Sequence, residues 1–302
     1  MKLFIADAFT EELFGGNPAG IVLLSGSDET TVWPAEETMI KTAAELRYSE
    51  TAFCLPLEDG SFRTRYFTPA AEVDLCGHAT IATFTVLRRE GLLKGDGPFI
   101  NRTLAGDLEI CVTERNVLME MAEPKIEGEM TDEEALKELY SVMGLKYTPS
   151  AGGVPVHPGI KAYPKMVSTG LLDIMMPVKD EAELDAIEPD FPALAELSDR
   201  YGVVGVHAFC IASDEEQRMG ITAHARNFAP LYDIDEEAAT GTSNGALTYY
   251  LQSIGFLGEV DDACIIQGEK MDRPSTIRTH IEGKRILVGG DAVILAEGEI
   301  HI

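Results

Sequence analysis

Basic side chains are scarce in this chain. Only 24 Lys and Arg stand against 51 Asp and Glu among 302 residues, which gives a formal net charge of −27. A surface of that sign repels the phosphates of nucleic acids and the headgroups of anionic membranes, both of which bind basic proteins. We therefore expect neither a nucleic-acid partner nor a membrane partner.

Long hydrophobic runs are also missing, since no stretch approaches the roughly 20 apolar residues that span a bilayer. The first acidic residue, Asp7, comes too early for the apolar region of a signal peptide. We therefore expect a soluble, cytoplasmic protein. Its 45% content of hydrophobic residues is typical of globular proteins, and its length fits about two domains.

Cysteines are few and scattered. Their number is odd, and no two stand in the CxxC spacing that is typical of zinc sites. We therefore expect no disulfide framework and no bound metal. The five residues are Cys54, Cys76, Cys111, Cys210 and Cys264.

What the chain does contain is an internal repeat. Residues 65–69, Arg-Tyr-Phe-Thr-Pro, recur as residues 226–230, Arg-Asn-Phe-Ala-Pro. Farther along, Gly77 matches Gly241 at nearly the same offset, and each glycine comes directly before a helical segment. Ordered matches at nearly one offset indicate two copies of one structural unit rather than chance similarity.

The helical segment after each glycine has no charged face. Residues 79–87 and 245–251 carry no charged side chain, and a helix without a polar stripe is buried. We therefore predict an α+β fold of two pseudo-symmetric lobes. In each lobe a curved, mostly antiparallel sheet wraps around one central buried helix, and the active site lies in the cleft between the lobes.

The predicted lobe boundaries follow the two copies of the repeat. Residues 1–125 are assigned to the N-terminal lobe and residues 126–287 to the C-terminal lobe. The last segment, 288–302, alternates like strands and is a candidate for a return to the first lobe. The sequence alone leaves this return open.

The start of each buried helix is a candidate binding site. Unpaired N–H groups and the helix dipole attract anions to a helix N-terminus, and Gly77 and Gly241 allow close backbone approach. The alternative is that these glycines merely begin their helices tightly. Because both copies keep the arrangement, we expect a small carboxylate-bearing substrate.

Two titratable residues of the first copy are candidates for chemistry. His78 directly follows Gly77; a single histidine is more often structural, but this one lies beside the expected anion site. Glu50 begins an apolar β segment, where partial desolvation would suit general acid–base catalysis. Taken alone, Glu50 would pass for an ordinary exposed acid.

Taken together, the motifs resemble the phenazine-biosynthesis PhzF-like family, within the diaminopimelate epimerase-like superfamily. The matching stretches span nearly the whole chain in the family's order. They are Asp7-Ala8-Phe9, Gly16-Asn17-Pro18-Ala19, Tyr48 to Phe53, Phe67-Thr68-Pro69, Cys76 to Thr80, Ser168-Thr169-Gly170, Arg226 to Pro230, Ala239 to Thr242, and Gln267-Gly268.

The resemblance implies a homodimeric isomerase with no cofactor, which shifts a proton on a small unsaturated carboxylic acid. The family's catalytic glutamate falls on Glu50, which would act as a single general acid and base. The resemblance assigns substrate binding to Ser49, Gly77, His78, Glu237, Thr240, Gly241 and Thr242.

One of these positions departs from the family pattern. The family's substrate-contacting aspartate falls on Glu237, whose side chain is one methylene longer. The longer side chain narrows the room for the substrate or moves the carboxylate. This change argues against the phenazine precursor itself as the substrate.

Two other functions stay open. The first is a racemase, epimerase or dehydratase of an amino or hydroxy acid that uses Cys76. Two-cysteine epimerases of the superfamily need a second thiol, however, at the position where Thr240 stands. The second is a non-catalytic protein that binds small molecules on the same scaffold.

Overall fold

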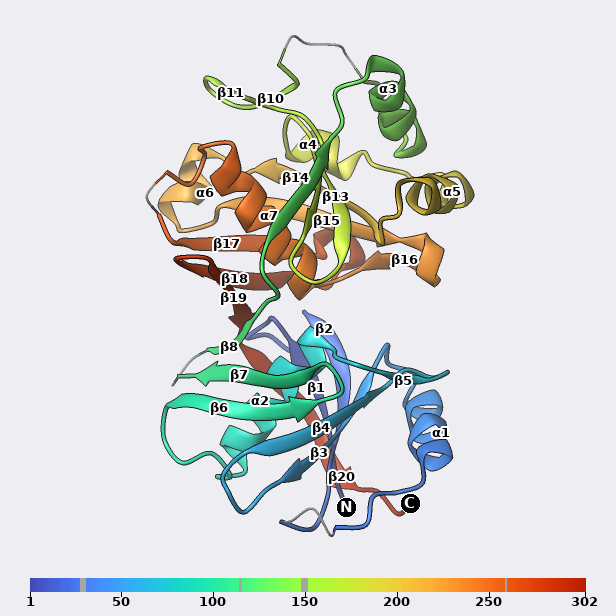
Figure 1. Cartoon of the computed structure of the whole chain (residues 1–302), viewed down its shortest axis with the longest axis vertical. Coiled ribbons are helices and arrows are strands. Elements are labelled where there is room, and N and C mark those ends of the chain that lie inside the picture. Colours follow the sequence, from blue (N-terminus) through green and yellow to red (C-terminus); the bar gives the residue numbers. More distant parts are fainter. Residues whose placement is uncertain (28–30, 114–115, 148–151, 259) are drawn as a thin grey trace. The chain divides into compact units, whose positions relative to one another are not determined.

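The structure is a computed structural model that describes residues 1–27, 31–113, 116–147, 152–258 and 260–302. Helices and extensive β-sheet are mixed along the chain, which confirms the predicted α+β class. By their internal contacts, the residues divide into two compact units (Figure 1). Unit 1 comprises Met1–Glu120 and Gly289–Ile302, and unit 2 comprises Met121–Val288.

Unit 1 is a mainly antiparallel sheet with a helix on each face. Its strands pair in the order β20, β1, β2, β3, β4, β6, β7, β8, and the pairs β2–β3 and β4–β6 are parallel. The elements are β1 (Lys2–Ala8), β2 (Asn17–Leu23), α1 (Glu36–Leu46), β3 (Thr51–Pro56), β4 (Phe62–Phe67), β5 (Glu72–Val73), α2 (Gly77–Arg89), β6 (Gly97–Thr103), β7 (Gly106–Val112), β8 (Val117–Glu120) and β20 (Ala292–Glu299).

The C-terminal segment belongs to unit 1. Strand β20 pairs antiparallel with β1, and Lys2 lies opposite Glu299. Figure 1 shows this red strand among the blue strands of the N-terminal segment. The division of the chain by contacts falls at residues 120 and 288, beside the sequence-predicted boundaries at 125 and 287.

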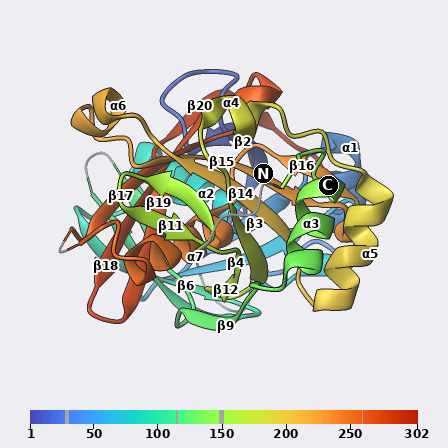
Figure 2. The same ribbon diagram turned by 90° about the horizontal axis from the view of Figure 1, so that it is seen from above.

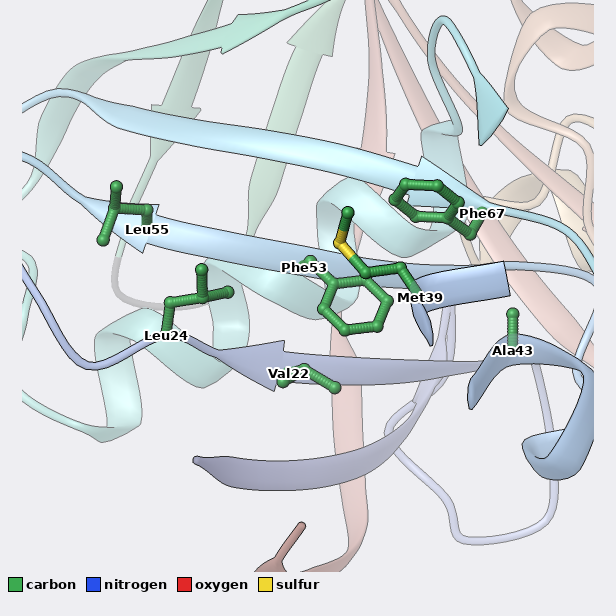
Figure 3. Close-up of a cluster of buried hydrophobic side chains, with 7 residues drawn as sticks. All are labelled: Val22, Leu24, Met39, Ala43, Phe53, Leu55 and Phe67. Atoms are coloured by element: carbon green, nitrogen blue, oxygen red, sulfur yellow. The ribbon is translucent and has the colours of Figure 1, made fainter. Parts of the chain in front are cut away.

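Strand β3 is buried on both faces because each face is covered by a helix. Phe53 and Leu55 point to the side of α1 and pack in a cluster with Met39 and Ala43 of that helix (Figure 3). Helix α2 contacts β1, β2, β3, β8 and β20. All of its residues from 78 to 87 are buried, as a helix without a charged face requires.

Unit 2 repeats the strand pattern of unit 1. The pairs β13–β14 and β15–β17 are parallel, whereas β14–β15 and β17–β18 are antiparallel. The strands are β9 (Lys125–Glu129), β10 (Val154–His157), β11 (Ile160–Ala162), β12 (Lys165–Ser168), β13 (Leu172–Pro177), β14 (Gly205–Ile211), β15 (Ala223–Ala229), β16 (Ile234–Glu237), β17 (Asp262–Gln267), β18 (Ser275–Glu282) and β19 (Arg285–Gly290), which contains the boundary at 288.

Helix α7 is the counterpart of α2 in unit 2. It contacts β12, β13 and β18, and residues 243–248 are all buried. The neighbouring helices α3 and α5 pack against each other (Figure 2). The helices are α3 (Glu133–Val142), α4 (Glu181–Asp185), α5 (Phe191–Tyr201), α6 (Asp214–Arg218) and α7 (Gly241–Ser253), with short 3₁₀ helices η1 (Pro230–Tyr232) and η2 (Glu269–Met271).

The repeated arginine motif is a structural ion pair in both units. Arg65 of β4 donates two hydrogen bonds of 2.6 Å to Glu72, and Arg226 of β15 donates two of 2.8 Å to Glu236. Bidentate pairs of this kind fix geometry as well as charge. Within the residues that the structure describes, no helix is both long enough and apolar enough to cross a membrane.

We expect the packing around α2 to dominate the stability of unit 1. Phe84 is fully buried and lies edge-on to Phe62, with ring centroids 5.4 Å apart. Phe84→Ala should lower the free energy of unfolding by about 3–5 kcal/mol, measured by urea denaturation. The control is Leu104→Ala, at a side chain that is 61% exposed, where less than about 0.5 kcal/mol is expected. Equal losses in the two variants would contradict this packing.

A buried carboxyl makes the stability of unit 2 depend on pH. Burial raises the pKa of Asp173 from 3.8 to about 6, although hydrogen bonds from Ser243 and from the Gly205 backbone oppose the shift. The folded chain therefore binds this proton more tightly than the unfolded chain. Its contribution is complete below about pH 4 and is lost as the pH rises through about 6.

Asp173→Asn removes this titration. The free energy of unfolding is measured by denaturation of both proteins at pH 4.5 and at pH 7.5. The difference between variant and parent should shift by about 2 kcal/mol in favour of the variant from the lower to the higher pH. Asp199→Asn, at an exposed position of α5, is the matched control and should show no such gain. A parallel pH dependence in the parent and in Asp173→Asn would show that Asp173 does not titrate as described.

Candidate functional site

Glu50 lies at the junction between α1 and β3. Helix α1 ends at Leu46, and its C-cap residue Arg47 adopts a left-handed conformation with φ of 61°. The chain then turns toward the first residue of β3. The backbone carbonyl of Glu50 accepts a hydrogen bond from Gly20 of β2, which ties the residue to the sheet. Its side chain is 20% exposed, so the carboxylate is partly withdrawn from water yet reachable.

The Glu50 carboxylate faces the imidazole of His78. Its Oε2 lies 3.4 Å from His78 Nε2, and Ser49 Oγ lies 3.3 Å from the same nitrogen. His78 itself is buried in the first turn of α2, directly after Gly77. Unit 1 therefore brings together the four predicted residues Ser49, Glu50, Gly77 and His78.

His78 is neutral at neutral pH. Burial lowers its pKa below the usual 6.5, and the negative charge of Glu50 only partly offsets this effect. A neutral imidazole has one donor nitrogen and one acceptor nitrogen. Asn17 Nδ2 lies 3.3 Å from Nδ1. This amide donor assigns the ring proton to Nε2, the nitrogen that faces Glu50 and Ser49.

Asn17 has no role in the sequence-based interpretation, although it stands in the Gly16-Asn17-Pro18-Ala19 stretch. It is the first residue of β2 and is buried. The preceding Gly16 has φ of +61°, and a Cβ there would lie 2.1 Å from the Ala8 carbonyl oxygen. The glycine therefore permits the tight turn that brings Asn17 to His78.

Cys76 also contacts the imidazole. Its Sγ lies 3.4 Å from His78 Nδ1, and the side chain is buried. Cys76 is the N-cap residue of α2, as Thr240 is of α7. In the part of the chain that the structure describes, neither residue makes a side-chain capping hydrogen bond. The first N–H groups of both helices are therefore without the usual side-chain acceptor.

In unit 2, the remaining predicted residues form a continuous segment from the end of β16 to the first turn of α7. Thr240 Oγ1 donates a hydrogen bond of 2.7 Å to Glu237 Oε2. Gly241 and Thr242 begin α7, and the Thr242 carbonyl accepts a hydrogen bond of 2.8 Å from Thr169. Thr169, in the matching Ser168-Thr169-Gly170 stretch, thus supports the helix start.

Among the residues that the structure describes, two groups of side chains have the geometry to hold a metal ion. They are Glu50, Cys76 and His78 in unit 1, and Glu181, His224 and Glu269 in unit 2. In each group the ligand atoms lie within 4.8 Å of one another. The sequence predicts no metal site, and this absence stays a prediction.

In the second group the imidazole is already bound on both sides. His224 Nδ1 lies 2.8 Å from Glu269 and Nε2 lies 3.2 Å from Glu216. Burial by itself lowers the pKa of His224, but the Glu269 hydrogen bond and the charges of Glu269, Glu181 and Glu216 outweigh it. The pKa is therefore held above 6.5. The His224 imidazole thus lies between two carboxylates that raise its pKa.

Unit 2 also contains a cavity of about 270 Å³ away from these residues. Its lining includes Tyr140, Tyr147, Lys146 and Lys179. No residue of the predicted site is part of the described lining of this cavity, so the cavity does not enter the assignment of the active site.

Comparison with known proteins finds relatives that match this chain over nearly its whole length. An uncharacterized isomerase of Deinococcus radiodurans is 36% identical over 96% of this chain and 92% of its own length. The crystal structure of the Bacillus anthracis phenazine biosynthesis protein of the PhzF family matches with a TM-score of 0.80 and 27% identity. This match covers 100% of this chain and 99% of the other.

A more distant likeness concerns the fold alone. A probable proline racemase of Agrobacterium radiobacter matches with a TM-score of 0.61 and 12% identity, over 100% of this chain and 93% of its own.

The model of the PhzC-PhzF family, described as phenazine biosynthesis-like protein, matches residues 6–298. The chain therefore belongs to the PhzC-PhzF family of phenazine biosynthesis-like proteins.

Proposed function

We propose that this chain is an isomerase that shifts a proton on a small unsaturated carboxylic acid, with Glu50 as the general acid and base and without a cofactor. The observation that carries the proposal is the position of the Glu50 carboxylate, 20% exposed and 3.4 Å from a neutral, buried imidazole. Membership of the family supports it, and curated relatives are named uncharacterized isomerases.

The neutral state of His78 matters for this chemistry. A permanently charged imidazolium beside Glu50 would stabilise the carboxylate and weaken it as a base. A neutral ring instead places no positive charge beside the carboxylate, whose Oε2 lies 3.4 Å from His78 Nε2. A carboxylate that lies close to a neutral imidazole, with no charged partner there, suits the role of a positioned general base.

The proposed reaction uses one proton and no other reagent. The Glu50 carboxylate removes a proton from one carbon of the substrate, and the C–H electron pair enters the conjugated system that ends in the substrate carboxylate. The protonated Glu50 then returns the proton to another carbon of that system. One C–H bond breaks and one forms, so the product is an isomer of the substrate.

Because the molecule has a net charge of −27, a substrate carboxylate can bind only where the local electrostatic potential is positive. We propose that Ser49, Gly77 and His78 bind substrate at the uncapped start of α2. We also propose that Glu237, Thr240, Gly241 and Thr242 bind it at the uncapped start of α7. Backbone N–H groups at a helix start attract an anion over a short range even when the overall charge is negative.

One observation favours the thiol-based alternative, a racemase, epimerase or dehydratase. Cys76 Sγ lies close enough to His78 Nδ1 for the imidazole to accept its proton. The corresponding position in unit 2 is Thr240, whose hydroxyl donates to Glu237 instead of acting as a base. A two-base mechanism therefore has one thiol where it needs two.

The proposal predicts the result of one substitution. Small unsaturated, amino and hydroxy carboxylic acids are incubated with the protein in D₂O, and deuterium incorporation is followed by nuclear magnetic resonance. Glu50→Gln keeps the shape but removes the base, so exchange should fall about 10²–10⁴-fold. Glu45→Gln, at an exposed position of α1, is the matched control and should keep the parent rate.

A second substitution separates the alternatives. Cys76→Ser should change the exchange rate by less than about tenfold if Glu50 is the only acid–base group. Exchange that persists in Glu50→Gln but disappears in Cys76→Ser would establish the thiol mechanism instead. Acids that raise the melting temperature of the parent without any exchange would indicate a binding protein.

A further inference from the structure

Gln267 is a fully buried side chain at the end of β17, in the Gln-Gly stretch to which no role has been given. Its Oε1 accepts hydrogen bonds from the Thr240 N–H at 3.2 Å and from Asn244 Nδ2 at 2.6 Å. Its Nε2 donates to the Glu237 carbonyl at 2.7 Å and to Thr240 Oγ1 at 3.2 Å. A carboxamide offers two donors and accepts at one oxygen. Both donors and the oxygen of Gln267 therefore bind groups of the segment from Glu237 to Asn244.

These bonds fix the direction of a short hydrogen-bond chain. Because Thr240 Oγ1 accepts from Gln267, its own proton is available to Glu237 Oε2, which lies 2.7 Å away. The carboxamide therefore orients the hydroxyl, and the hydroxyl orients the carboxylate. Gln267 therefore contacts Glu237 in two ways. It donates a hydrogen bond to the backbone carbonyl of Glu237, and it orients the Glu237 side chain through the Thr240 hydroxyl.

The same chain explains why α7 is uncapped. A threonine at the N-cap normally accepts a hydrogen bond from the N–H of the second or third helical residue, here Thr242 or Ser243. The Thr240 hydroxyl is instead held between Gln267 and Glu237, and its side chain makes no capping bond within the described residues. The N–H groups at the start of α7 are thereby left for another acceptor.

The glycine after Gln267 makes the close approach possible. Gly268 has φ of +85°, and a Cβ there would lie 2.5 Å from the Arg273 carbonyl oxygen and 2.6 Å from that of Ala238. No larger residue fits this turn without a shift of the backbone. Gly268 therefore lets the end of β17 lie directly against the segment that Gln267 holds.

We propose that Gln267 is the positioning residue of the substrate-binding segment Glu237–Thr242. It directs the Thr240 proton to Glu237 and keeps the first N–H groups of α7 available for a substrate carboxylate. This role rests on the proposed function, because it concerns how the same substrate is bound. Gln267 itself does not need to touch the substrate.

Gln267→Glu tests the proposal with a side chain of the same shape. The ionised carboxylate loses both donors, so the Thr240 hydroxyl is free to turn and cap α7. On an acid that passes the deuterium screen, KM should rise at least about tenfold and kcat should change less than about threefold, because uniform binding is lost while Glu50 is untouched. The rise in KM should shrink at lower pH, where the protonated side chain regains one donor.

The control is Gln217→Glu, a chemically identical change elsewhere in unit 2. Gln217 Nε2 also donates to a backbone carbonyl, that of Ala212, at 2.7 Å. This variant should keep the KM of the parent over the whole pH range. An unchanged KM in folded Gln267→Glu, or an equal rise in both variants, would overturn the proposal.

A readout without substrate separates this proposal from the reaction itself. In Gln267→Glu, amide hydrogen exchange at Thr242 or Ser243 should slow as Thr240 caps the helix. If Gln267→Glu does not fold, Thr240→Val takes its place and should raise KM, because it removes the hydroxyl that directs Glu237; an unchanged KM in that variant refutes the role. In Gln267→Glu, slower amide exchange with no reactive acid would support the positioning role and refute the reaction, whereas unchanged amide exchange refutes the role.

Discussion

Each unit depends on one helix that has no side facing water. Residues 78–87 of α2 and 243–248 of α7 are buried, so strands must surround each helix, and the alternation of parallel and antiparallel pairs supplies them in both units. Such a helix still begins with N–H groups that lack partners within it. Both helices begin at a glycine, and neither has a side-chain cap among the described residues. The glycine that begins each buried helix is thus also the position at which we propose that the substrate carboxylate binds.

The side chains around these helix starts are arranged so that they do not cancel the positive electrostatic potential of the unpartnered N–H groups. His78 is kept neutral by burial, so it lies 3.4 Å from Glu50 without placing a positive charge there. Glu236 is paired with Arg226, while the neighbouring Glu237 is directed by Thr240. The net charge of −27 therefore describes the surface as a whole, but it is a poor guide to the chemistry at the start of a buried helix.

Much of this could be predicted from the sequence, because the informative signals are local. The uncharged stretches after Gly77 and Gly241 predict buried helices, and the Gly-His pair places His78 in the first turn of α2. Asn17 and Gln267 could not be given roles in the same way. Asn17 lies 61 residues from His78, and Gln267 lies 27 residues from Thr240. Their hydrogen bonds depend on strand register and on side-chain direction, which no local pattern encodes.

We propose that one carboxylate, that of Glu50, both takes the proton from the substrate and returns it. The most direct test is a single turnover in H₂O of a substrate that carries deuterium at the carbon losing its proton. We expect part of the deuterium to appear at the receiving carbon of the product, because Glu50 holds it between the two steps. Complete replacement by solvent hydrogen within that first turnover, at a rate that Glu50→Gln leaves unchanged, would contradict it.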